Sequence, residues 1–362
     1  MSTHTLAAPG MRGLQDRLWS AVTDRDEHAA ASVVLTALDD GVDAESVLLD
    51  VIAPVQARVG TEWAANRLSV AQEHAASAIA ERVIAALAHH PAVRTAPRLG
   101  RVTVACVDQE WHVLPARLLA EVLTLRGWRV DFLGAQVPTP HLIGHLHSNG
   151  ADVVALSSSI PTRLPTAHAA ITACQAVGVP VLAGGAAFGP DGRHARRLGA
   201  DAWEPDARSA ARRIADGIAV PAAGRQQIDD LPHLGDQEYT LVVRSRPQLV
   251  REVLAQLETR FPASAAYTEE QREHTAQDIA HVVDYLGVAL YMDDDELFTD
   301  FLAWTAGILE ARRVPAASLR PVLDVLGAEL KDFPRTTRLL GRARTVLDAF
   351  PATAGPTTGA FG

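Results

Sequence analysis

The sequence predicts a multidomain protein with all-α and α/β parts: an N-terminal helical bundle, a doubly wound parallel sheet, and an all-α C-terminal domain. In the middle of the chain, short apolar runs alternate with helix-like stretches, a pattern typical of a parallel sheet covered by helices on both faces. On either side, apolar residues recur at helical spacing without strand-like alternation. We place the bundle at 11–90, the sheet domain at 101–220, the C-terminal domain at 238–350 and a disordered tail at 351–362.

The bundle region has helical stripes of apolar side chains and one break. The stripes are formed by Leu14, Leu18, Val22, Val51, Val55 and Val59. The break comes at Ser69, which forms a Ser-x-x-Gln capping box with Gln72 and so begins a new helix. In one unbroken helix Trp63 and His74 would stand about 16 Å apart along the axis, whereas a tight corner aims Trp63, Glu73 and His74 at one space. The alternative is a core tryptophan beside a solvated Glu-His pair.

Four apolar runs predict the strands of the sheet domain: RVTVACV, WRVDFLG, ADVVALSSS and PVLAGG. The helices that follow the first three strands close at Gly127, near Gly150 and at Gly178, and two further helical pieces follow the fourth strand. Sheets of this kind bind ligands beyond the carboxyl ends of their strands. We therefore expect the functional site in the segments that follow the strands.

The segment DQEWHVLP, residues 108–115, comes directly after the first strand. Pro115 suits the first turn of the next helix, so Glu110 and His112 lie in a loop at the ligand edge of the sheet. One histidine is too few for a zinc site, which takes three or four protein ligands. It is enough where a macrocycle such as a haem or a corrin supplies the equatorial nitrogens. Glu110 would then accept a hydrogen bond from His112 and fix its tautomer.

The C-terminal region predicts several helices and one unusual polar stripe. The pairs Thr268/Gln271 and Asp293/Glu296 have the spacing of helix starts, and Pro315 and Pro334 interrupt later helices. The stripe occupies one helical face and consists of His274, Asp278, His281 and Tyr285. A solvated face is the alternative interpretation, and a zinc site lacks a convincing third ligand.

Composition excludes several classes of protein. The net charge of −10 and the lack of a basic recognition helix argue against direct binding of nucleic acid. Cys106 and Cys174 are too few for a disulfide framework. There is no secretory segment and no apolar run of membrane-spanning length, so we expect a cytoplasmic protein without a membrane partner.

On these residues, 101–220 resembles a flavodoxin-like cobalamin-binding domain. The resemblance implies that His112 is the lower axial ligand of cobalt, with Glu110 behind it, and that the nucleotide tail of cobalamin enters the sheet. The supporting positions are a Leu-Gly turn, a serine run and a glycine pair: Leu133, Gly134, Ser157, Ser158, Ser159, Gly184 and Gly185. Glycine permits close approach of a ligand to the backbone. Many family members have glycine where this chain has Pro115.

A bundle with a tryptophan, nine intervening residues and Glu-His is similar to the adenosylcobalamin light sensors of the CarH type. This resemblance implies that Trp63 covers the adenosyl group, Glu73 holds its ribose and His74 makes a further upper-face contact. It also implies photolysis of the cobalt–carbon bond, a changed assembly and no catalytic turnover. Some sensors have a histidine directly after the tryptophan, where this chain has Ala64.

The order of bundle, sheet domain and C-terminal helices is similar to that of the photocobilins, light sensors that also hold a bilin such as biliverdin. The residues that this resemblance assigns to the bilin are His274, Asp278, His281, Tyr285, Trp304 and Arg313, with Phe298 and Arg312 as further candidates. No cysteine follows Cys174, so a bilin would be held without a thioether bond. Haem, with His274 or His281 as axial ligand, is the rival cofactor.

These resemblances predict a light-dependent homo-oligomer. Because we find no DNA-binding module ahead of the bundle, we expect the protein to signal without binding DNA itself. The alternatives are a corrinoid carrier protein for methyl transfer, which also has a bundle and a strand-end histidine, and a cobalamin or haem sensor. The Trp63 and Glu73 pair and the extra helical domain argue against a carrier. A cobalamin mutase would need a large barrel, which this sequence lacks.

Overall fold

The computed structural model describes residues 10–219 and 231–350, and the chain divides into two compact units, 1–227 and 228–362. Each unit is described by itself. The tail 351–362, for which we expect disorder, lies outside the described residues. Among the described residues, no helix combines the length and the apolar character that a membrane span requires.

The first unit begins with the predicted helical bundle. Its elements are α1 (Met11–Thr23), α2 (Glu27–Asp39), α3 (Ala44–Val47), the π-helix η1 (Leu48–Ile52), α4 (Ala53–Ala64) and α5 (Val70–Ala88). All six residues of the predicted apolar stripes are buried, which confirms the helical spacing. The π-helix, a rare element that often marks functional positions, was not foreseen.

The corner between α4 and α5 forms as predicted. The Ser69 hydroxyl accepts a hydrogen bond from the Gln72 backbone N–H, and the Gln72 side chain accepts one from the Ser69 N–H, which completes the capping box. Asn66 adopts a left-handed conformation with φ of 57° and closes the turn. Trp63 therefore lies in the last turn of α4, and Glu73 lies in the first turn of α5.

A parallel sheet follows, with the strand order β2-β1-β3-β4-β5 among the described residues. This is the flavodoxin-like order, so the predicted fold class is confirmed. The strands are β1 (Arg101–Cys106), β2 (Arg129–Gly134), β3 (Val153–Ser157), β4 (Val181–Gly184) and β5 (Ala202–Trp203). The sequence analysis found the first four and missed β5, because two residues are too few to show a strand pattern.

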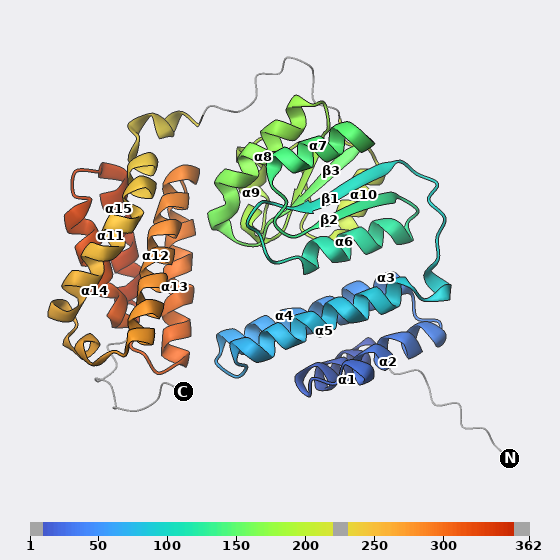
Figure 1. The fold of residues 1–362 in the computed structure, drawn as a ribbon, viewed down its shortest axis with the longest axis horizontal. Coiled ribbons are helices and arrows are strands. Elements are labelled where there is room, and N and C mark those ends of the chain that lie inside the picture. Colours follow the sequence, from blue (N-terminus) through green and yellow to red (C-terminus); the bar gives the residue numbers. More distant parts are fainter. Residues whose placement is uncertain (1–9, 220–230, 351–362) are drawn as a thin grey trace. The chain divides into compact units, whose positions relative to one another are not determined.

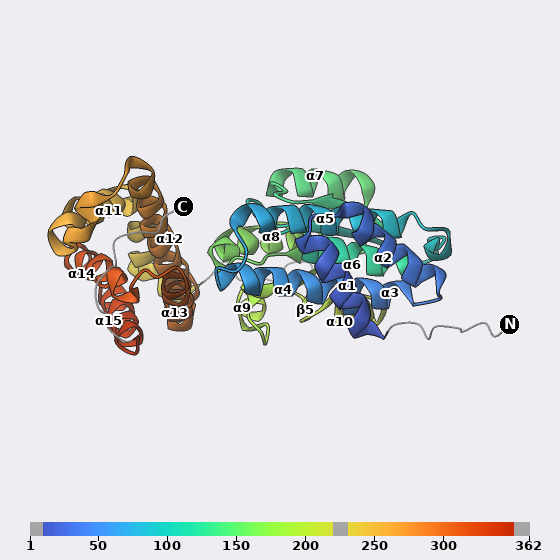
Figure 2. The same ribbon diagram turned by 90° about the horizontal axis from the view of Figure 1, so that it is seen from below.

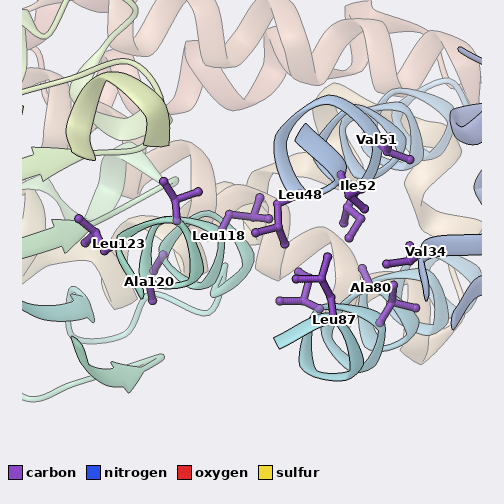
Figure 3. Packing of buried hydrophobic residues seen from close by; sticks show 14 of the residues in the cluster. Val34, Leu48, Val51, Ile52, Ala80, Leu87, Leu118, Ala120 and Leu123 are labelled. Atoms are coloured by element: carbon purple, nitrogen blue, oxygen red, sulfur yellow. The ribbon is translucent and has the colours of Figure 1, made fainter. Parts of the chain in front are cut away.

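Helices cover both faces of this sheet. They are α6 (Leu114–Leu125), α7 (Thr139–Asn149), α8 (Leu164–Ala176), α9 (Arg193–Arg197) and α10 (Ala207–Ala215). Figure 1 shows α6 between the sheet and the bundle, with α7 and α8 on the opposite face. Seen from below in Figure 2, α4 and α5 lie in front of α6. One continuous apolar core joins the two parts: Leu118 of α6 points toward Leu48 and Leu87 of the bundle (Figure 3).

The second unit is all-α within its described residues. Its long helices are α11 (Glu238–Arg260), α12 (Glu269–Met292), α13 (Asp295–Ala311), α14 (Arg320–Glu329) and α15 (Pro334–Asp348). The Thr268/Gln271 capping box of α12 is confirmed. The predicted start at Asp293 is wrong by one residue: Asp294 is the N-cap of α13, and Asp293 has a φ of 45° and ends α12.

A buried carboxylate ties the first and last of these helices together. Glu238, at the start of α11, accepts hydrogen bonds from the backbone N–H groups of Arg335 and Thr336 at 3.0 and 2.8 Å, and from the Thr336 hydroxyl at 2.9 Å. These N–H groups belong to the first turn of α15 and have no partner within that helix. Glu238 therefore caps α15 from another element.

Candidate functional site

The loop after β1 presents His112 to solvent while burying the carboxylate that holds it. Glu110 Oε1 lies 2.6 Å from His112 Nδ1 and accepts the His112 backbone N–H at 2.9 Å. The His112 side chain is 57% exposed, and the Glu110 side chain is 1% exposed. Because Nδ1 is engaged, Nε2 is the nitrogen left for a ligand, the arrangement usual for a metal-bound histidine.

The serine run after β3 completes the support of Glu110. Its Oε2 accepts hydrogen bonds from the backbone N–H groups of Ser159 and Ile160 at 2.7 and 3.0 Å, and from the Ser158 hydroxyl at 3.2 Å. Burial alone would raise the pKa of Glu110, but the hydrogen bonds from His112, Ser159 and Ile160 outweigh it and lower the pKa to about 2. The hydrogen bond to Glu110 in turn raises the pKa of His112, against the effect of its burial.

A second carboxylate–imidazole pair lies in the first turn of α5. Glu73 Oε2 is 2.7 Å from His74 Nδ1, and Glu73 Oε1 accepts a hydrogen bond from the Ser77 hydroxyl at 2.9 Å. Gln56 of α4 donates to Ser77 at 2.6 Å and so links the two helices. The charge of Glu73 contributes to the raised pKa of His112, which places this turn of the bundle on the same side as the strand-end loop.

Trp63 lies on the other side of the corner between α4 and α5. It is partly buried in the last turn of α4, and its neighbour Ala64 is partly buried as well. The structure therefore brings the corner, Glu73 and His112 into one compact unit. The roles assigned to Trp63, Glu73 and His74 stay predictions.

A large cavity separates the bundle from the sheet domain. Its volume is about 670 Å³, within the range of about 300–1,000 Å³ usual for cofactor pockets. A slot of about 110 Å³ continues from it into the edge of the sheet, and the cavity and the slot share Pro115, Asp206 and Ala207. The predicted cobalamin residues Trp63, Glu73, His74 and His112 lie outside the linings of both the cavity and the slot.

The strand-end residues named in the sequence analysis divide between that slot and its surroundings. Ser157, Gly184 and Gly185 line the slot. A side chain at Gly185 would meet the Ser158 backbone carbonyl oxygen at 2.3 Å, so the chain needs glycine there to pack two loops as well as to leave room for a ligand. Leu133 and Gly134 end β2, where Gly134 has a φ of 79° and open space around it.

The residues of the predicted bilin site do not all line one pocket. His274 and Asp278 line a pocket of about 170 Å³ in the second unit, together with Tyr267 and Gln271. The other candidates lie outside the lining of that pocket: His281, Tyr285, Trp304, Arg313, Phe298 and Arg312. Desolvation raises the pKa of Asp278, and the charges of its neighbours His281, His274 and Arg312 partly offset that rise.

Aromatic residues of α12 and α13 form a ladder that runs to the surface. The Tyr285 ring stacks on Phe301 with centroids 3.7 Å apart, and Phe301 is 6.4 Å from Trp304, which is 51% exposed. Phe298 is fully buried and Arg313 has a φ of 62°. The site assigned to these residues stays a prediction.

Sequence reasoning missed several residues around the cavity. Gln56 and Ser77 support Glu73, and Asp206, Arg208 and Arg212 line the cavity. Asp206 also caps α10 through the Ser209 N–H, a spacing that was visible in the sequence. Gln56, Ser77, Arg208 and Arg212 form no recognisable sequence motif, because only tertiary packing brings them together.

Two regions of the chain match known families. Residues 100–215 match the B12 binding domain family, and residues 14–88 match a second B12 binding domain family. Both matches are to families of B12 binding domains. The cavity and the slot described above are lined by residues of these two matched regions.

The curated relatives include two repressors from Myxococcus xanthus. The HTH-type transcriptional repressor CarA is 32% identical over 187 residues, which cover 49% of this chain and 59% of that protein. The HTH-type transcriptional repressor CarH is 32% identical over 170 residues, which cover 45% and 51%. The chain thus spans little more than half the length of these relatives.

A solved structure has the same architecture as the two B12 binding domains. The monomethylamine corrinoid protein of Methanosarcina barkeri aligns with a TM-score of 0.50 and 18% identity, covering 56% of this chain and 97% of that chain. At this level of identity, the likeness shows the fold alone.

Proposed function

We propose that this protein is a light-responsive regulator that binds adenosylcobalamin between its bundle and its sheet edge and does not act as a turnover enzyme. One observation carries the proposal: the buried Glu110 fixes the exposed His112 through Nδ1 at the end of β1, within the region that matches a B12 binding domain family. The relatives named as transcriptional repressors support a regulatory role.

In this proposal His112 holds the lower face of the corrin through Nε2, and Ser157, Gly184 and Gly185 enclose the nucleotide tail. Adenosylcobalamin, when bound, supplies a cobalt–carbon bond that light cleaves. Trp63 packs against the upper ligand, and Glu73, held by Ser77, accepts hydrogen bonds from it.

The free energy of a buried tryptophan contact is comparable to that of a two-state switch. A tryptophan buries about 150–250 Å², which corresponds to about 4–6 kcal/mol at about 25 cal/mol per Å². Inverting a two-state population from 1:99 to 99:1 takes about 5.5 kcal/mol. The free energy of packing that Trp63 would lose with the upper ligand is therefore comparable to the free energy needed to shift the bundle and any assembly that depends on its position.

Illumination of Trp63→Ala protein tests this function. We expect dark-purified parent protein to take up adenosylcobalamin and to change its assembly size after illumination, measured by light scattering during size exclusion. Trp63→Ala should bind the cofactor but lose the change in size. Trp19→Ala is the matched control, because Trp19 lies elsewhere in the bundle under Arg58, and it should behave like the parent.

Two outcomes would contradict the proposal. If the protein purified in the dark does not bind adenosylcobalamin, the proposed function is wrong. If Trp63→Ala changes its assembly size on illumination as the parent does, Trp63 does not cover the upper ligand. Selective binding of methylcobalamin over adenosylcobalamin would instead favour a corrinoid carrier.

We further propose that the second unit holds biliverdin without a covalent bond, with Asp278 beside the pyrrole N–H groups. The pocket there is smaller than the roughly 300 Å³ lower limit usual for such ligands, so binding requires the helices around it to open. His274 and Asp278 support the proposal, because both are polar groups in a pocket with apolar walls.

Asp278→Asn should weaken biliverdin binding by about 10- to 100-fold, because a hydrogen bond to a charged group contributes about 1.5–3 kcal/mol. Titration followed by the long-wavelength absorbance of biliverdin measures this affinity. Asp332→Asn, at an exposed position of the same unit, is the control and should bind like the parent. A haem Soret band that disappears in His274→Ala would show haem to be the cofactor instead.

A further inference from the structure

Four charged side chains join the bundle to the sheet domain at one place. Arg208 of α10 donates to both carboxylate oxygens of Asp50 at 3.0 and 2.6 Å. Arg126, which ends α6, donates to both oxygens of Glu45 at 3.0 and 2.8 Å. Arg208 also lies 3.3 Å from Glu45, so the two pairs form one network, which we name the clamp.

The clamp is electrically balanced and partly shielded from water. Its side chains are 19% (Glu45), 28% (Arg126), 37% (Arg208) and 39% (Asp50) exposed. The hydrogen bond from Arg208 lowers the pKa of Asp50, so this carboxylate stays charged over a wide pH range. Bidentate arginine–carboxylate pairs fix orientation as well as distance.

Contacts between the bundle and the sheet domain gather at the clamp end. Glu45 and Asp50 lie in α3 and η1, and Leu48 and Leu87 of the same end pack against Leu118 of α6 (Figure 3). The connection from α5 to β1 leaves from this end too, as Figures 1 and 2 show. At the opposite end of α4 and α5 lies the corner 65–69. The 670 Å³ cavity begins at the clamp, where Arg208 lines it, and continues along the first half of α4 as far as Ala57.

We propose that the clamp is the hinge about which α4 and α5 swing as a lever over the sheet edge. Asp50 and Trp63 are thirteen residues apart, about 20 Å along a helix, so a rotation of about 10° at the clamp moves the corner by about 3.5 Å. Asp50 lies within the π-helix η1, which joins α3 to α4. The bond from Arg208 holds that turn in place.

This hinge is a property of the chain itself, so it is testable in cobalamin-free protein and stands apart from the proposed function. Spin labels at Val70→Cys in α5 and His141→Cys in α7 report the distance from the corner end to the sheet domain, and both positions are exposed. The native Cys106 and Cys174 are buried, and burial raises the pKa of each thiol to about 12, so the labels react with the introduced cysteines.

Asp50→Asn and Arg208→Gln should each shift the mean label distance by about 3 Å or broaden its distribution, as the lever length requires. Glu27→Gln is the matched control: it removes a pair with Arg82 that lies within the bundle, and it should leave the distribution unchanged. An unchanged distribution in both folded clamp variants overturns the proposal.

Salt gives a second measurement if the clamp variants do not fold. Raising the ionic strength to 1 M shortens the Debye length to about 3 Å, which weakens ion pairs that are partly exposed. The parent with both labels should then show a broader distance distribution at 1 M than at 0.1 M salt. An unchanged distribution across this range overturns the proposal.

Discussion

Replacing His112 with alanine is expected to weaken cobalamin binding by more than about 100-fold, because loss of a supporting residue alone costs about 10- to 100-fold in metal affinity. His112 supplies the exposed imidazole whose Nδ1 is held by Glu110 at 2.6 Å. Absorbance titration of the purified protein measures the affinity. The bound spectrum should also lose the signature of imidazole coordination, which isotopic labelling of histidine nitrogen detects by electron paramagnetic resonance of the Co(II) form.

His147→Ala is the matched control for that change. His147 is an exposed histidine in the last turn of α7, and it should leave both affinity and spectrum as they are. The fold should survive His112→Ala, since His112 is exposed and Glu110 keeps its bonds to Ser158, Ser159 and Ile160. If His112→Ala binds cobalamin with the parent's affinity and spectrum, His112 is not the lower ligand.

The parts of the fold that sequence analysis predicted correctly depend on local interactions. The capping boxes at Ser69 and Thr268 join residues three positions apart, and the buried stripe through Leu14 and Leu18 repeats once per helical turn. The prediction that Pro115 lies in the first turn of α6 has the same local origin. Such signals are complete within one segment, so one sequence is enough to read them.

The features that sequence analysis missed depend on distant partners. Glu110 is bound by backbone N–H groups 49 and 50 residues away, and backbone donors leave no mark on the sequence. Asp50 and Arg208 are 158 residues apart and pair only because the bundle packs on α10. In the C-terminal unit, helical spacing placed His274 and His281 on one face, but neighbouring helices decide which of them lines the pocket.

The substitution Glu110→Gln tests, in cobalamin-free protein, how much the buried Glu110 carboxylate stabilises the fold. A shift of the Glu110 pKa from its ordinary value of 4.5 to about 2 corresponds to about 3 kcal/mol of stability at neutral pH, at 1.36 kcal/mol per unit. The glutamine side chain is uncharged, and its amide N–H groups would face the backbone N–H donors of Ser159 or Ile160. Urea unfolding at pH 7 should therefore show a loss of about 3 kcal/mol.

The pH dependence separates this effect from a simple packing defect. Because the pKa of Glu110 is lowered in the folded state, its contribution is present above pH 4.5 and is lost as the pH falls from 4.5 to about 2. The raised pKa of His112 works in the opposite sense: its contribution is present below its ordinary value of 6.5 and is lost as the pH rises through the folded value. Glu110→Gln should flatten both parts of the stability profile.

Glu121→Gln provides the control for that profile. Glu121 lies on α6, and desolvation raises its pKa, so the neutral variant should keep the parent's loss of stability between pH 4.5 and 2. If Glu110→Gln retains the parent's acid transition, the hydrogen bonds to Glu110 do not stabilise its charge. The tautomer of His112 would then need another support, because the Glu110 bond to Nδ1 is what leaves Nε2 available to cobalt.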